Sequence, residues 1–125
     1  MKKVTIVIPT RNSELSLPKV LESIIQLNYN KKLIKIVIVD SSSQDRTLEI
    51  IQNFASRYSA EFESIEIITL LTRVTTSKAR NVGARKASRG SYLFFLDSDV
   101  VLVNSNILNE LLHLLSENPK VGAVG

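Results

Sequence analysis

Two aspartates stand two positions apart in Asp97-Ser98-Asp99, directly after the apolar run from Tyr92 to Leu96. Carboxylates held this closely at the end of a buried strand carry desolvation and repulsion costs that a bound cation can offset. Mg²⁺ and Mn²⁺ suit such a pair, because they prefer oxygen ligands and keep positions open for substrate phosphates. An ordinary helix cap or turn is the alternative. The apolar strand before the pair and a basic segment upstream favour the metal.

That basic segment runs from Arg73 to Arg89 and holds six lysines and arginines with no acidic residue. The whole chain has 16 basic and 12 acidic residues, so the remainder carries 10 against 12 and is slightly acidic. A solvated helix face would explain the segment without function. The functional interpretation is attraction of phosphate, either on a small molecule or on nucleic acid.

The sequence lacks the residues that several other common chemistries require. The chain contains no cysteine, and its one histidine, His113, is expected on the surface of the last helix, away from the leucine face. Only four glycines occur, and neither a GxGxxG nor a GK[ST] pattern is present. Dinucleotide-dependent redox chemistry and P-loop ATP hydrolysis are therefore disfavoured.

The composition indicates one globular domain over residues 1–125, with 44% hydrophobic and 22% charged residues. The most apolar stretch, Tyr92 to Val103, is interrupted by Asp97 and Asp99 and is shorter than the roughly 20 residues of a membrane span. The expected location is the cytoplasm, or the cytoplasmic face of a membrane if a longer parent protein carries an anchor.

Hydrophobic periodicity predicts strands that alternate with helices, and hence a mainly parallel sheet in an α/β fold. The expected helices have Ser16, Asp45 and Ser77 as N-caps, with Gly90 ending the third, and a last helix covers 106–117. The fourth strand is apolar on both faces and is expected to be central. The predicted strands cover residues 3–8, 33–39, 65–71 and 91–96, and another begins at 121–125.

Polar residues crowd at the carboxyl ends of three of these strands, in Pro9 to Asn12, in Asp40 to Ser42 and in Asp97 to Asp99. Ligands of open α/β sheets bind beyond those ends, where the strand order reverses. The site is therefore expected there.

Three segments lie along the chain in this order: Val7 to Asn12, Val37 to Asp45, and Ala79 to Gly83 followed by Gly90 to Asp99. In order and spacing they resemble family 2 glycosyltransferases of the GT-A fold, and the resemblance covers nearly the whole chain. It implies a three-layer α/β/α domain with a Rossmann-like, mainly parallel sheet, shortened to the donor-binding part of a longer catalytic domain.

The resemblance also implies residue roles. Asp40 resembles the acid that hydrogen-bonds the base, usually uracil. Asp97 would contact the ribose or the metal, Asp99 would bind Mn²⁺ or Mg²⁺, and Ser98 lies between them. The residues expected to line the nucleotide pocket after the first strand are Pro9, Thr10, Arg11 and Asn12, and those on the third helix that approach the nucleotide are Lys78, Arg80 and Asn81.

The implied reaction transfers a sugar from a nucleotide-diphosphate sugar to an acceptor hydroxyl on a carbohydrate or lipid-linked acceptor. It is expected to depend on a metal and to invert the anomeric centre, with a carboxylate general base beyond Gly125. Two positions depart from the family's common pattern: Arg11 replaces an aromatic residue, usually tyrosine, and the second strand ends in Asp-Ser-Ser-Ser instead of Asp-Asp-Gly-Ser.

Two other functions remain as alternatives. A nucleic-acid or polyanion binding module would use the Arg73 to Arg89 segment, but no aromatic residue for base stacking lies within it. A nucleotidyltransferase normally has a Gly-rich loop after the first strand, and Thr10 to Leu15 contains no glycine. No nucleic-acid partner is therefore expected, whereas the strand at 121–125 is a possible edge for homo-oligomer formation.

Overall fold

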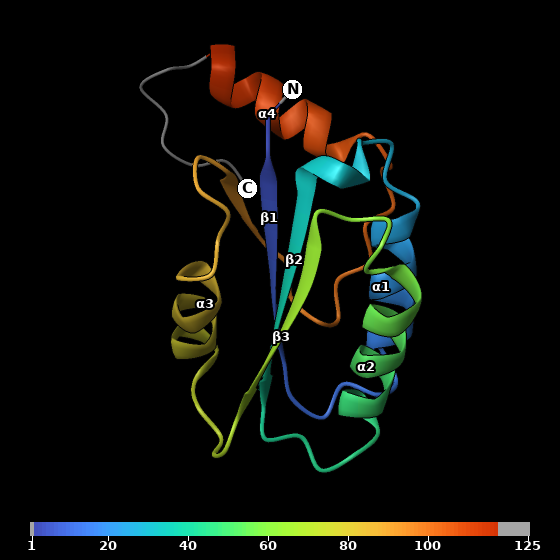
Figure 1. Cartoon of the computed structure of the whole chain (residues 1–125), viewed down its shortest axis with the longest axis vertical. Helices are drawn as coiled ribbons and strands as arrows, with labels where there is room; N and C mark the ends of the chain where they lie inside the picture. Colours follow the sequence, from blue (N-terminus) through green and yellow to red (C-terminus); the bar gives the residue numbers. More distant parts are fainter. Residues whose placement is uncertain (1, 118–125) are drawn as a thin grey trace.

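The computed structural model describes residues 2–117, which form four strands and four α-helices (Figure 1). The expected strand at 121–125, and with it the possible oligomer edge, lies outside the described residues. A short 3₁₀-helix, Lys31–Leu33, precedes β2. The elements are β1 (Val4–Thr10), α1 (Leu17–Ile25), β2 (Ile34–Ser41), α2 (Thr47–Tyr58), β3 (Ser64–Leu70), α3 (Thr76–Ala84), β4 (Tyr92–Phe95) and α4 (Ile107–Glu117).

The sheet has the order β3-β2-β1-β4, and every neighbouring pair is parallel. The chain first adds strands on one side of β1 and then crosses to the other side to form β4. This reversal puts the topological switch point between β1 and β4, so a ligand crevice is expected beyond their carboxyl ends.

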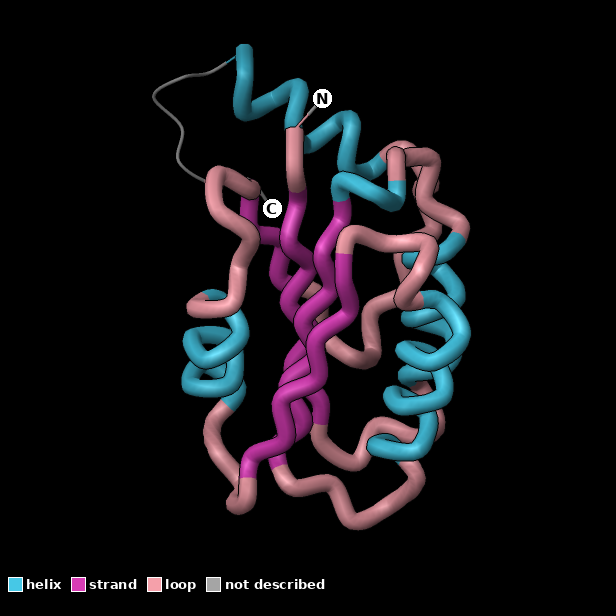
Figure 2. Tube along the Cα trace, in the orientation of Figure 1, coloured by secondary structure: helices cyan, strands magenta, loops and turns pink. Residues whose placement is uncertain are grey.

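Helices cover both faces of the sheet and give three layers (Figures 1 and 2). On the face covered by α1 and α2, the core joins Ile6 and Ile8 of β1 to Leu17 and Val20 of α1 and to Ile51 of α2. The apolar residues of α1 at i, i+3 and i+4 spacing thus form the face that packs, and the leucine face of α4 reaches the same core through Leu108.

Helix α3 covers the opposite face and lies very close to the strands. A Cβ added to Gly83 would collide with the side chain of Val7 and lie 3.1 Å from that of Val39. Ala79, one turn earlier, is buried against the same two valines. The small residues on the inner face of α3 therefore set how closely this helix approaches the strands.

Strand β4 is an edge strand of the described sheet, so the predicted central position is wrong for residues 2–117. The side chains of Leu93 and Phe95 are 44% and 43% exposed. An apolar run shows that both faces of a strand suit burial, but it carries no information on the order of the strands.

Helix ends also differ from the prediction. Helix α3 ends at Ala84 instead of reaching Gly90, which adopts a left-handed conformation (φ 76°) in the turn before β4. Thr75, not Ser77, caps this helix by accepting a hydrogen bond from the Lys78 N–H. Ser16 occupies the N-cap position of α1, but its hydroxyl does not cap the helix.

Two predictions about surface features can be compared directly with the structure. His113 is exposed on α4, as predicted, and lies 3.9 Å from Glu117. Within residues 2–117 the helices are all too short, or insufficiently apolar, to cross a bilayer.

Candidate functional site

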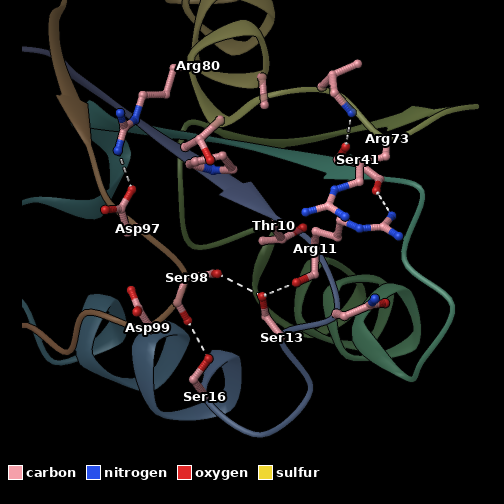
Figure 3. Close-up of a pocket in the computed structure, with 15 residues that line it drawn as sticks. Thr10, Arg11, Ser13, Ser16, Ser41, Arg73, Arg80, Asp97, Ser98 and Asp99 are labelled. Carbon is pink, nitrogen blue, oxygen red and sulfur yellow. Dashed lines mark hydrogen bonds and ion pairs between the residues drawn. The ribbon is translucent and has the colours of Figure 1, made fainter.

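A cavity of about 670 Å³ opens beyond the carboxyl ends of β1 and β4, at the switch point of the sheet (Figure 3). Its first wall is the segment 9–13, which covers the end of β1 and the loop after it, together with Ser41 at the end of β2. Its second wall is made by residues around the start of α3, including Arg73 and Arg80. The Asp97-Ser98-Asp99 loop closes the third side.

The wall made by β1 and β2 is braced by Asp40, whose side chain is only 2% exposed. Its Oδ1 accepts hydrogen bonds from the Thr10 hydroxyl at 3.1 Å and from the Ser43 hydroxyl at 2.6 Å, and its Oδ2 accepts one from the Ser43 N–H at 3.1 Å. A buried carboxylate needs such donors to offset its lost hydration. Asp40 therefore fixes the loop after β2 against the end of β1.

Arg11 and Asn12 tie the same two loops together from the other side. Nη1 of Arg11 donates to the carbonyl oxygens of Ser41 and Ser42, both at 2.7 Å. The side chain of Asn12 accepts from the Gln44 N–H at 2.8 Å. Asn12 and Ser42 both have a positive φ, 46° and 54°, so these contacts hold two strained turns in place.

Across the cavity, Arg80 of α3 reaches the first aspartate of the Asp97-Ser98-Asp99 loop. Its Nη2 lies 2.6 Å from Oδ1 of Asp97, and both side chains are partly exposed, at 36% and 47%. This arginine thus compensates part of the negative charge of the two aspartates, which a metal ion was expected to compensate.

Serine hydroxyls attach the Asp97-Ser98-Asp99 loop to the entrance of α1. The hydroxyls of Ser13 and Ser98 lie 2.8 Å apart, and the Ser16 hydroxyl donates to the Ser98 carbonyl oxygen at 2.9 Å (Figure 3). Ser13 is itself held in place, because its N–H donates a hydrogen bond to the buried Thr47 hydroxyl at 2.7 Å. We call Ser13, Ser16 and Ser98 the serine clasp.

Asp45 supports the segment that carries the serine clasp. Its carboxylate accepts hydrogen bonds from the N–H groups of Thr47 and Glu14. Slight desolvation raises the pKa of Asp45, but hydrogen bonds from the side chain and backbone of Thr47 and from the Glu14 N–H outweigh it, so the pKa is lowered below the ordinary value. Arg46 occupies the N-cap position of α2. Asp45, the predicted cap, stands one residue earlier and accepts a hydrogen bond from the N–H of Thr47, the first residue of the helix.

Most of the residues predicted for the site meet at this cavity. Asp40 lies just behind its wall, and Lys78 and Asn81 lie on the exposed side of α3, outside the lining. The predicted residues that line it are Pro9, Thr10, Arg11, Asn12, Arg80, Asp97, Ser98 and Asp99.

Sequence reasoning missed several lining residues, among them Ser13, Ser16, Ser41 and Arg73. Ser41 directly follows a predicted site residue, and Arg73 opens the acid-free segment, so both carried a signal. Nothing in the sequence marks Ser13 and Ser16, because single serines are common in loops between strands and helices.

Among residues 2–117 no three side chains of histidine, aspartate or glutamate come together as a complete metal cage. Asp99 lines the cavity, is exposed, and has no hydrogen bond or ion pair to the rest of the described chain. One or two carboxylates plus substrate phosphates are the usual ligands of Mg²⁺, so the residues fit an ion that is shared with a bound diphosphate.

The model of the family described as glycosyl transferase family 2 matches residues 5–125. The chain belongs to this family. It is 28% identical to the poly(ribitol-phosphate) beta-N-acetylglucosaminyltransferase TarS of Staphylococcus aureus over 94% of the chain and 20% of TarS. It is 32% identical to the glycosyltransferase AglE of Haloferax volcanii over 77% of the chain and 30% of AglE.

Solved structures give the same result for the fold. A crystal structure of Staphylococcus aureus TarS 1–349 in complex with UDP-GlcNAc matches with a TM-score of 0.80 at 28% identity, over 94% of the chain and 32% of that structure. The mannosyltransferase PcManGT of Pyrobaculum calidifontis, in complex with GDP-Man and Mn²⁺, matches with a TM-score of 0.84 at 23% identity, over 98% of the chain and 34% of that structure. The expected α/β fold of GT-A type is confirmed. The chain spans a fifth to a third of the length of these relatives.

Proposed function

We propose that the chain forms the donor-binding part of a glycosyltransferase that uses a nucleotide-diphosphate sugar. The observation that carries this proposal is the cavity at the switch point, where Asp97 and Asp99 face arginines from two other segments in a chain of glycosyl transferase family 2. Carboxylates that can share a cation with phosphates, placed opposite guanidinium groups, suit a diphosphate better than an uncharged ligand.

The named ligands of relatives support this choice. The TarS structure holds UDP-GlcNAc, and the PcManGT structure holds GDP-Man and Mn²⁺. By analogy, the rigid wall built by Thr10, Arg11, Asn12 and Asp40 would take the nucleoside. The diphosphate would lie toward Arg80 and the Asp97-Ser98-Asp99 loop.

The donor site is proposed to use Mn²⁺ or Mg²⁺ held by Asp99, with Asp97 beside it. Such an ion supplies positive charge where the leaving nucleotide diphosphate gains negative charge. The protein's own part is to fix the nucleoside through the β1 and β2 loops, to present Arg80 to the phosphates and to hold the aspartate loop through the serine clasp.

The proposed transfer goes to the hydroxyl of a carbohydrate or lipid-linked acceptor, with inversion of the anomeric centre. In such a displacement a carboxylate removes the proton of the attacking hydroxyl while the bond to the nucleotide diphosphate breaks. The proposal assigns none of the described carboxylates to that base, since Asp97 and Asp99 face the donor. The proposed location is the cytoplasm, or the cytoplasmic face of a membrane if a longer parent protein carries an anchor.

The alternative of a polyanion binding module gains little from the fold. The Arg73 to Arg89 segment does not form one basic surface, because Arg73 and Arg80 line the cavity whereas Lys86 lies 3.9 Å from Glu66 at the other end of α3. Divided in this way, the segment favours a small phosphorylated ligand over a long polymer.

Calorimetric titration tests the proposal. UDP and GDP are titrated into the protein with and without Mn²⁺, and into the Asp99→Ala and Glu49→Ala variants. Glu49 is an exposed residue in the first turn of α2 and serves as a matched loss of one negative charge. We expect metal-dependent binding of at least one nucleotide that Asp99→Ala abolishes and Glu49→Ala leaves unchanged. Absence of binding to the unaltered protein, or equal binding by Asp99→Ala, would overturn the proposal.

A further inference from the structure

The guanidinium of Arg80 is only partly used by its surroundings. Its Nη2 donates to Asp97, but its Nε is buried and has no hydrogen-bond partner among residues 2–117. An arginine offers five donors in a rigid plane, and a buried donor without a partner is destabilising. The single contact with Asp97 therefore leaves Arg80 short of acceptors among the described residues.

The contact also affects Asp97 as a ligand. Oδ1 of Asp97 lies 2.6 Å from a permanently charged guanidinium, whereas no described residue pairs with Asp99. A divalent ion approaching both aspartates would meet the positive charge of Arg80, and it would compete with Arg80 for the Asp97 carboxylate. In the absence of a diphosphate, the ion is therefore expected to bind weakly.

A diphosphate would supply the acceptors that Arg80 lacks, and it would also end the competition between Arg80 and the ion for Asp97. Its oxygens can accept two parallel hydrogen bonds from one arginine, which a single carboxylate oxygen does not provide here. An Arg80 that turns to the phosphates leaves the Asp97 carboxylate facing the ion. Arg80 belongs to α3, which packs rigidly on the sheet through Ala79 and Gly83, so only the side chain has to move.

We propose that Arg80 exchanges partners, from Asp97 when no donor is bound to the donor diphosphate when it is bound, and so couples metal binding to nucleotide binding. This inference rests on the proposed function, because it assumes that a nucleoside diphosphate enters the cavity. It makes Arg80 a positioning residue for the metal, with opposite effects on the two ligands: it opposes the ion alone and favours the ion together with the diphosphate.

The first test measures the affinity of the protein for Mn²⁺ alone, by electron paramagnetic resonance of the free ion. Arg80→Gln is expected to bind Mn²⁺ about two- to fivefold more tightly than the unaltered protein, the size of effect that a partly exposed ion pair supports. The same variant is expected to bind UDP or GDP in the presence of Mn²⁺ about tenfold more weakly, because it loses charge-assisted hydrogen bonds. A residue with a purely structural role would not strengthen metal binding.

Arg85→Gln is the matched control, since Arg85 is an exposed arginine at the C-cap of the same helix. It should behave as the unaltered protein with both ligands. Unchanged or weaker Mn²⁺ binding by Arg80→Gln, alongside normal nucleotide binding by the unaltered protein, overturns the inference and leaves the proposed function standing. If the unaltered protein binds no nucleotide in the presence of Mn²⁺, both fail together.

A second measurement needs no variant. The Nε–H signal of Arg80 is followed by ¹⁵N NMR while Mg²⁺ and a nucleoside diphosphate are added to the unaltered protein. Mg²⁺ alone is expected to leave the signal nearly in place, and the two ligands together are expected to shift it strongly, as Nε gains an acceptor. A signal that stays fixed at saturation with both ligands contradicts the exchange even if Arg80→Gln fails to fold.

Discussion

The two sides of the cavity are built on different principles. On the β1 and β2 side, the buried carboxylate of Asp40 and the guanidinium of Arg11 take part in five hydrogen bonds, three of which join the end of β1 to the end of β2. On the β4 side, one partly exposed ion pair from Arg80 and the serine clasp hold the aspartate loop. Under the proposed function, the first side would take the nucleoside with little rearrangement, whereas the second holds charged groups that would change partners when phosphate and metal bind.

The largest expected difference between the two sides is in stability. Asp40→Ala leaves the Thr10 hydroxyl and the Ser43 N–H without their buried acceptor and should lower the free energy of unfolding by about 3 kcal/mol. Asp97→Ala removes only a partly exposed ion pair and should change it by less than about 0.5 kcal/mol. Urea denaturation followed by circular dichroism measures both. Equal losses in the two variants would contradict the contrast between the sides.

A second prediction concerns the helix that carries Arg80. Gly83→Ala places a methyl group against Val7 and Val39 and should lower the free energy of unfolding by about 1–3 kcal/mol. The distance between α3 and the strands should also increase, and we therefore expect weaker nucleotide binding in the calorimetric assay. Gly90→Ala is the control, because its Cβ would meet no atom within 4 Å and only the positive φ is strained. A smaller loss of about 1 kcal/mol is expected there, and no effect on the nucleotide.

Much of this arrangement follows from the sequence, but in unequal measure. The β-branched runs of β1 and β2 and the polar residues after them indicated the rigid side correctly, because strand periodicity and strand ends are local features. The partner of Asp97 did not follow, since Arg80 stands 17 residues earlier on a different element. The order of the strands also cannot be inferred from local sequence patterns. For that reason β4 was expected in the centre of the sheet, whereas it lies at the edge of the described part of the sheet.

The serine clasp should contribute to both stability and binding. Ser98→Ala removes the hydroxyl contact with Ser13 but keeps the carbonyl bond to Ser16, and it should cost about 1 kcal/mol of unfolding free energy. The looser aspartate loop should lower the affinity for Mn²⁺ and nucleotide together by a few fold, as measured by calorimetry. Ser116→Ala on the exposed side of α4 is a suitable control. Identical binding by the two variants would show that the clasp does not position the aspartates.

The smallest predicted effect is a pH dependence. The folded-state pKa of Asp45 is lowered, so its stabilising contribution is present above the unfolded value near 3.8 and is lost as the pH falls through the lower folded pKa. Asp45→Asn should therefore show a shallower loss of stability than the unaltered protein as the pH falls below about 4. Urea denaturation at pH values between 5 and 3 gives the comparison. Parallel pH profiles would mean that Asp45 does not brace the serine clasp through its charge.

A crystal structure of the protein with Mn²⁺ and a nucleoside diphosphate tests the central claim most directly. The account predicts an anomalous manganese peak roughly 2 Å from an Asp99 oxygen, the diphosphate between that ion and Arg80, and the nucleoside against Thr10 and Arg11. A nucleotide bound away from this cavity, or a manganese ion without contact to Asp99, would contradict it.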